Sequence, residues 1–177
     1  MSFSSPSAGS FVKLAETTAS NLASVSLNGF FTSDYDVYKI FIDGYYATVD
    51  GQYSVIRFAT TGSYTVQTSS YRNANARVRG GTDIVPNDDA SYFQVHIVSN
   101  SSTSTNNGEI TIYNPLKTTS YHTITGLIQH WNGTGSLNSS SFSGSWDNTT
   151  AVTGIQFSAS SGNIYANKIR LYGIKNS

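Results

Sequence analysis

The feature that most constrains this chain is the alternation of apolar and polar side chains, which recurs in run after run. In YDVYKIFIDG (35–44), Tyr38, Ile40 and Ile42 fall on one side of an extended chain, and Lys39 and Phe41 fall on the other. A period of two residues is that of a β-strand with one buried face. The most helix-like window, VKLAETTASNLA (12–23), is short and rich in Thr and Ser, which are poor helix formers. The sequence therefore predicts an all-β protein.

Further runs of this kind are separated by turns rich in Gly, Asn and Ser, a spacing typical of sandwiches and barrels. We predict an antiparallel β-sandwich, jelly-roll-like and with negligible helix, in a single domain over residues 11–177. The runs are FVKLA (11–15), ASVSL (23–27), QYSVIRFAT (52–60), SYTVQ (63–67), YFQVHIV (92–98), GEITIYN (108–114), YHTITGLIQHW (121–131), AVTGIQFSA (151–159) and NIYANKIRLYGI (163–174). The expected core residues are Ile40, Ile42, Ile56, Phe58, Ile110, Ile112, Ile155, Phe157, Ile169 and Leu171.

Two short turn signals predict hairpins. VDG (49–51) joins the runs 35–44 and 52–60, and SSGN (160–163) joins the last two runs. The chain stops almost as soon as its last run ends, so we expect an inner strand that pins the C-terminus in the sheet. Recognition of a partner is then expected elsewhere.

Three segments lack a clear strand pattern. MSFSSPSAGS (1–10) predicts a flexible arm that becomes ordered only against a neighbour, because it offers little apolar surface apart from Phe3. YRNANARVRGGTDIVPNDDA (71–90) reads as an irregular loop. NGTGSLNSSSFSGSWDNTT (132–150) is long for a loop, so it is either functional or contains a short strand around residues 142–146.

Charge excludes two classes of partner. Ten basic and ten acidic residues give a formal net charge of zero, and charged residues make up 11% of the chain. We therefore expect no general attraction to nucleic acid or to an anionic membrane.

No apolar run approaches the length of a transmembrane helix. The absence of cysteine excludes disulfides and thiolate metal sites.

No catalytic or metal-binding pattern stands out. The chain has no G-x-S-x-G, P-loop or G-x-G-x-x-G motif. His122 and His130 would lie about 26 Å apart along one strand, and His96 could approach either one only through the tertiary fold. We expect no enzyme and no cofactor. A calcium site built from loop carboxylates stays open beside simple turn capping by the same groups; these are Asp34, Asp36, Asp88 and Asp89.

Two local features are candidates for partner binding. Arginines in 71–90 could hold an acidic patch on a partner or a glycan carboxylate, or they could be solvated and balanced by nearby Asp residues. Two tryptophans bracket the polar segment 132–150 and suit flat, polar recognition, or they plug the ends of the sandwich. With the arm, the candidate residues are Phe3, Arg72, Arg77, Arg79, Trp131 and Trp146.

The end of the chain carries a resemblance. AVTGIQFSASSGNIYANKIRLYGIKNS (151–177) resembles the C-terminal segment of small structural proteins of tailed bacteriophages, and FTSDYDVYKIFIDG (31–44) looks like a second shared element. The resemblance implies a β-rich virion protein with no catalytic residues to carry over.

From this resemblance we expect a non-enzymatic virion structural protein, a capsid decoration (cement) protein. It would dock on the major capsid protein as a homotrimer, stabilise the head and sit on the virion surface after assembly in the host cytoplasm. The alternative is a tail or fibre tip domain that binds host-surface glycan through Trp131, tyrosine residues and the segment 132–150. Copy number per virion separates the two.

Overall fold

The computed structural model describes residues 9–60, 64–78, 82–131 and 136–176, with the backbone alone for 77–78 and 82–89. These residues form strands and turns, and none of them belongs to a helix that could cross a membrane. The strands are β1 (Phe11–Leu22), β2 (Ser24–Asn28), β3 (Tyr35–Ala47), β4 (Gln52–Thr60), β5 (Thr65–Val66), β6 (Tyr71–Val78), β7 (Thr82–Ala90), β8 (Phe93–Val98), β9 (Asn106–Tyr113), β10 (His122–Trp131), β11 (Leu137–Trp146), β12 (Val152–Ala159) and β13 (Ile164–Lys175).

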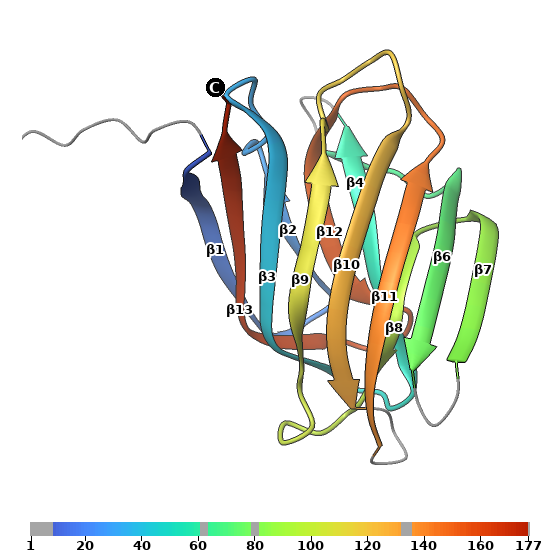
Figure 1. The fold of residues 1–177 in the computed structure, drawn as a ribbon. Coiled ribbons are helices and arrows are strands. Elements are labelled where there is room, and N and C mark those ends of the chain that lie inside the picture. The colour runs from blue at the N-terminus through green and yellow to red at the C-terminus, as the bar shows by residue number, and fades with distance from the viewer. Residues whose placement is uncertain (1–8, 61–63, 79–81, 132–135, 177) are drawn as a thin grey trace, which may run out of the picture.

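Two antiparallel sheets pack face to face (Figure 1). The large sheet has eight strands in the order β1-β13-β3-β9-β10-β11-β6-β7, and it faces the reader in Figure 1. The small sheet has the order β2-β12-β4-β5, and β8 also pairs with β4. The antiparallel β-sandwich predicted from the two-residue alternation is therefore confirmed.

The core between the sheets is built from cross-strand layers. Leu171 on β13 lies opposite Ile40 on β3, which in turn lies opposite Ile110 on β9. In the small sheet Phe157 lies opposite Ile56. Burial of one such side chain contributes about 1.5–3 kcal/mol. The predicted inward face of each run is confirmed, because every residue predicted for the core is buried. These residues are Ile40, Ile42, Ile56, Phe58, Ile110, Ile112, Ile155, Phe157, Ile169 and Leu171.

Both predicted hairpins are wrong. The turn at 49–51 joins β3 in the large sheet to β4 in the small sheet, and the turn at 160–163 joins β12 to β13 in the same way. Gly51 and Gly162 do have the positive φ angles expected of such turns, 69° and 78°. The two connections lie together, since the Thr48 backbone N–H donates to the Asn163 carbonyl at 2.8 Å. Alternation gives each strand one apolar face, but it does not say whether the next strand lies beside it or across the core.

The C-terminal strand is an inner strand, as predicted. β13 lies between β1 and β3, so its backbone is paired on both sides. β1 begins at Phe11, where the predicted domain begins. Just before it, the Gly9 N–H donates to the Lys175 carbonyl at 2.9 Å, and the Lys175 N–H donates to the Ser10 carbonyl at 3.1 Å. The rest of the predicted arm, residues 1–8, lies outside the described residues.

The region 71–90 is not an irregular loop. It forms β6 and β7, which pair with each other, and β6 also pairs with β11. The segment 132–150 does contain a strand, and β11 is longer than the stretch expected around 142–146. Both segments are poor in Val and Ile, so their strands carry few of the β-branched residues that mark the others.

Asparagine side chains on β6 of the large sheet form hydrogen bonds with β8 of the small sheet. Asn73 and Asn75 on β6 point inward and are buried. The Gln94 N–H on β8 donates to Asn73 Oδ1 at 3.0 Å, and Asn75 Nδ2 donates to the Gln94 carbonyl at 2.7 Å. Side-chain amides thus satisfy backbone groups of β8 that no neighbouring strand reaches, as buried polar groups require.

Candidate functional site

The outer face of the large sheet is a regular grid of side chains. Because strand register is fixed, outward positions on neighbouring strands lie in rows. One row holds Asn107 on β9, Gln129 on β10 and Ser139 on β11. The next row holds Leu127 beside Ser141. This face divides into a polar half over β9, β10 and β11 and a more aromatic, charged half over β1, β13 and β3.

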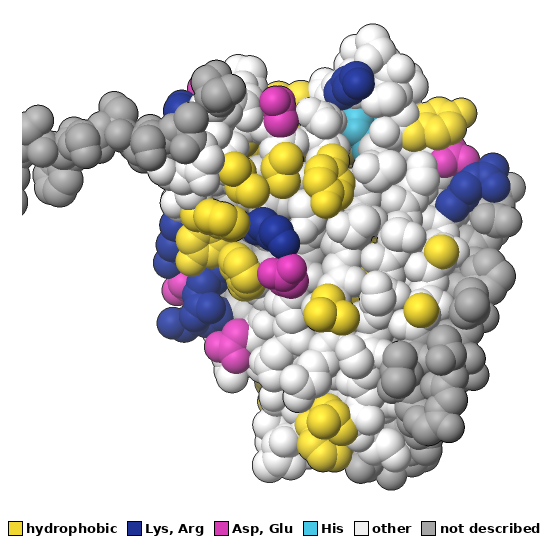
Figure 2. All heavy atoms as spheres, in the orientation of Figure 1, with side chains coloured by type: hydrophobic (Ala, Val, Ile, Leu, Met, Phe, Trp, Pro, Cys, Tyr) yellow, Lys and Arg dark blue, Asp and Glu magenta, His cyan; other side chains and the backbone are white. Residues whose placement is uncertain are grey.

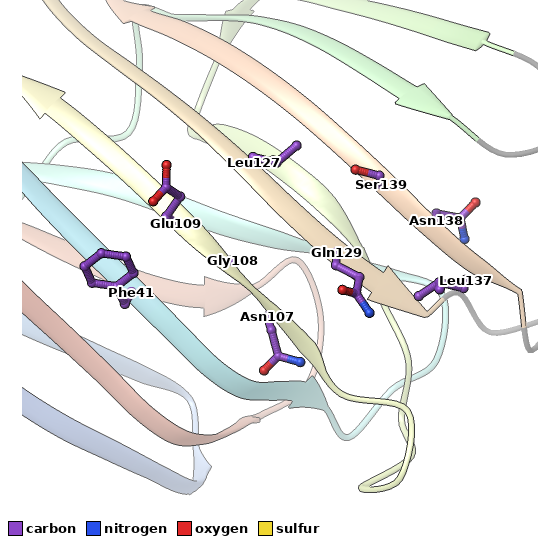
Figure 3. A pocket seen from close by; sticks show the side chains of 9 residues that line it. All are labelled: Phe41, Asn107, Gly108, Glu109, Leu127, Gln129, Leu137, Asn138 and Ser139. Carbon is purple, nitrogen blue, oxygen red and sulfur yellow. The ribbon is translucent and has the colours of Figure 1, made fainter.

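The polar half is hollowed. A hollow of about 760 Å³ crosses β9, β10 and β11, with Phe41 at its border with β3 (Figure 3). Figure 3 shows side chains from all three strands around it. We call this hollow the outer trough and define it by six of its lining residues: Asn107, Glu109, Leu127, Gln129, Leu137 and Ser139.

The outer trough carries almost no net charge. Its charged lining residue is Glu109, whose carboxylate accepts a hydrogen bond from Lys39 Nζ at 2.9 Å. Leu127 and Leu137 are each about half exposed, at 55% and 51%. The remaining lining groups are amides and a hydroxyl, which both donate and accept hydrogen bonds. Chemically, the trough suits an uncharged ligand with polar groups and apolar faces.

The other half carries an aromatic patch, which we define as Phe11, Phe41 and Tyr172. The rings of Phe11 and Tyr172 meet edge to face at 6.4 Å, and those of Phe41 and Tyr172 meet edge to face at 5.6 Å. Phe11 is 55% exposed. In Figure 2, hydrophobic side chains gather over this side of the face, with basic and acidic side chains beside them.

Ion pairs lie beside the aromatic patch, because Lys13 lies opposite Tyr172 and Arg170 lies opposite Phe41. Lys13 Nζ donates to Glu16 at 2.7 Å, and Arg170 Nε donates to the same carboxylate at 3.2 Å. The hydrogen bond from Lys13 is the main reason that the pKa of Glu16 is lowered. An apolar centre with a charged rim is the usual anatomy of a protein–protein interface.

The structure separates the residues that the sequence singled out. Trp146 is 1% exposed, and its Nε1–H donates to the Ser69 carbonyl at 3.1 Å. It packs against Phe58, Tyr71 and His122 in the core. The prediction that Trp146 contacts a partner is therefore wrong, because a core indole is not accessible. Trp131 ends β10, is half-buried and lies opposite Leu137 of the outer trough.

The predicted arginine cluster is not a loop feature. Arg72 is an outward residue of β6 and forms an ion pair with Asp147. Arg77 belongs to the same strand, where its backbone alone is described. Arg79 and Phe3 lie outside the described residues. Of the three predicted binding residues whose side chains are described, Arg72 points outward, Trp146 lies in the core, and Trp131 lies at the other end of the β10–β11 pair, so these three do not form one site.

Two histidines do meet through the tertiary fold. The rings of His96 on β8 and His130 on β10 lie 5.4 Å apart, and both side chains are buried. Neither ring nitrogen of His96 has a hydrogen-bond partner among the described residues. Burial, together with the neighbouring His130, holds the pKa of His96 well below its usual value of 6.5. Within the described chain, no three His, Cys, Asp or Glu side chains lie close enough to hold a metal ion.

The residues of the outer face were not predicted as a site, because the alternation in each run was used only to assign the buried side chains. The same alternation that places Ile40 and Ile42 inward places Lys39 and Phe41 outward, so that signal was present. Alternation does not give the order of the strands in the sheet, and this order decides which outward residues become neighbours.

No model of a known protein family matches this chain, and the comparison with curated proteins found no match.

Proposed function

We propose that this chain is a non-enzymatic structural protein of a tailed-phage virion, a capsid decoration protein that docks on the major capsid protein and stabilises the head. The resemblance of residues 31–44 and 151–177 to small phage structural proteins supports the virion assignment. Those residues contribute to β3, β12 and β13, which are inner strands of the two sheets. The observation that carries the docking proposal is the aromatic patch.

The aromatic patch has the character of an interface centre. Aromatic residues dominate the binding energy of protein interfaces, and they are most effective when a polar rim keeps water away. Phe11 leaves more than half of its surface in water, which is costly unless a partner covers it. The ion pairs of Glu16 with Lys13 and Arg170 supply the rim.

The position of the patch supports the same docking surface for the N-terminal segment. Phe11 directly follows the predicted arm, so the arm and the patch would reach the same partner. β1 is also the edge strand of the large sheet and pairs with β13 alone among the described strands. Edge strands are prone to pair with other chains, and a neighbouring copy in a homotrimer would cover this one.

Reconstitution on phage heads tests the docking proposal. Purified protein is added to heads that lack it, and bound copies are counted after sedimentation. We expect Phe11→Asp to reduce binding at least tenfold, because a charge replaces the apolar centre. The matched control is Tyr121→Asp, since Tyr121 is an aromatic residue of similar exposure, 57%, outside the patch. Equal binding by the two variants would remove the aromatic patch from the proposal, and no binding by the unmodified protein would refute capsid docking.

A further inference from the structure

Beyond docking, we infer that the outer trough is a binding site for a neutral oligosaccharide. Four features point to this ligand: the hydrogen-bonding groups of the trough, its apolar surface, the compensated charge of its described lining residues and the pairing of its backbone.

The polar groups of the trough are positioned and available. Asn107, Gln129 and Ser139 lie directly opposite one another on three adjacent strands. Asn107 Oδ1 accepts a hydrogen bond from the Gly44 backbone N–H at 2.8 Å. This bond fixes the orientation of the Asn107 side-chain amide and leaves its NH₂ group available to a ligand. The side chains of Gln129 and Ser139 make no hydrogen bond within the described part of the chain. Amides and hydroxyls that both donate and accept are suited to sugar hydroxyls, which do the same.

Apolar side chains flank these groups. Leu127 and Leu137 are half exposed, and Trp131 lies opposite Leu137 at the end of β10. A pyranose ring presents C–H faces as well as hydroxyls, so it can bury such side chains while its hydroxyls bond to the amides. A largely apolar lining with a few placed polar groups is the usual composition of a small-molecule site.

Charge selects a neutral ligand. The Glu109 carboxylate in the trough is compensated by Lys39. Among the described side chains that line the trough, none is a cation that could offset the repulsion between this carboxylate and an anionic ligand. A cationic ligand would have to compete with Lys39 for it. A neutral sugar chain needs neither.

Backbone pairing argues against an extended peptide as the occupant. β9, β10 and β11 are inner strands of the large sheet, each paired on both sides. A peptide that binds as an added strand needs an edge with unpaired N–H and C=O groups. In the trough only side chains can recognise the ligand, and these are the amides and hydroxyl described above.

An array of immobilised oligosaccharides tests this inference, with neutral, uronic-acid and sulfated chains printed side by side. The purified protein is expected to bind at least one neutral chain and none of the charged ones. Gln129→Ala should weaken that binding about tenfold or more, the loss expected for removed hydrogen bonds. The matched control is Gln156→Ala on the outer face of the small sheet, where Gln156 is partly buried, and it should bind normally.

A second variant keeps the test independent of the loss of one amide. Ser139→Trp fills the trough from an exposed position and should abolish binding while the melting temperature stays unchanged. Binding to no neutral chain, binding restricted to charged chains, or normal binding by Ser139→Trp would each overturn the inference. Phe11→Asp should retain sugar binding, so failure of the docking proposal and failure of this one are distinguishable.

Discussion

Replacing Leu171 by alanine tests the fold at the strand that ends the chain. Leu171 is fully buried on β13 and lies opposite Ile40 on one side and Ala15 on the other. Leu171 on β13 and its neighbour Ile40 on β3 both lie on strands that are paired on both sides, and such strands cannot move inward to fill the space without losing ladder hydrogen bonds. We therefore expect a cavity, and large-to-small changes at such sites cost about 2–5 kcal/mol. For a domain of ordinary stability, that is a large part of the total.

The matched control is the same substitution at Leu137, which is 51% exposed in the same sheet. Leu137→Ala should change the free energy of unfolding by less than about 0.5 kcal/mol, as is usual at the surface. Urea titration followed by far-UV circular dichroism measures both variants, and an unchanged slope shows that the unfolded state is comparable. If Leu171→Ala costs less than about 1 kcal/mol, or no more than Leu137→Ala, the reasoning about the core is wrong.

Three further predictions concern pH, the N-terminus and Arg77. Burial lowers the pKa of His96 and His122 in the folded state, so the unfolded chain binds protons first as the pH falls below about 6.5. The contribution of the two histidines to the free energy of unfolding should therefore be fully present above that pH. Below it, the free energy of unfolding should decrease by up to about 1.4 kcal/mol per pH unit for each histidine. Urea titrations at pH 7.5 and 5.5 measure this difference, and equal stabilities at the two pH values would contradict the prediction. Deleting residues 1–8 should leave the melting temperature unchanged and weaken attachment to heads, so unimpaired attachment would count against a docking arm. Arg77→Glu should reduce attachment in the head-binding assay, and normal attachment would leave Arg77 without a role there.

The sequence predicts much of this fold because one face of most strands is strongly apolar. Ile40, Phe58 and Leu171 could be assigned to the core from alternation alone, and the structure confirms them. Strand partners could not be assigned in this way. A two-residue period is the same whether the next strand lies in the same sheet or in the opposite one, so the turn at 160–163 looked like a hairpin and is a crossing between sheets.

The candidate site was harder to predict than the fold. Its residues are Ser, Asn, Gln and Leu on outward positions, which are unremarkable one at a time. They become a site because register places Asn107, Gln129 and Ser139 in one row across three strands. Trp146 was named as a candidate for partner binding because a tryptophan in a polar segment suggests recognition. The hydrogen bond of its indole N–H to Ser69 shows how a core position satisfies it instead.

The most direct test of the account is the number of copies of this protein on a phage particle. Virions from an infected culture are purified, and this chain is quantified against the major capsid protein on a calibrated gel. A capsid decoration protein should be present in hundreds of copies per particle, because it covers the repeated capsid lattice. A dozen copies or fewer would place the protein on the tail, and its absence from purified virions would contradict the assignment as a structural protein.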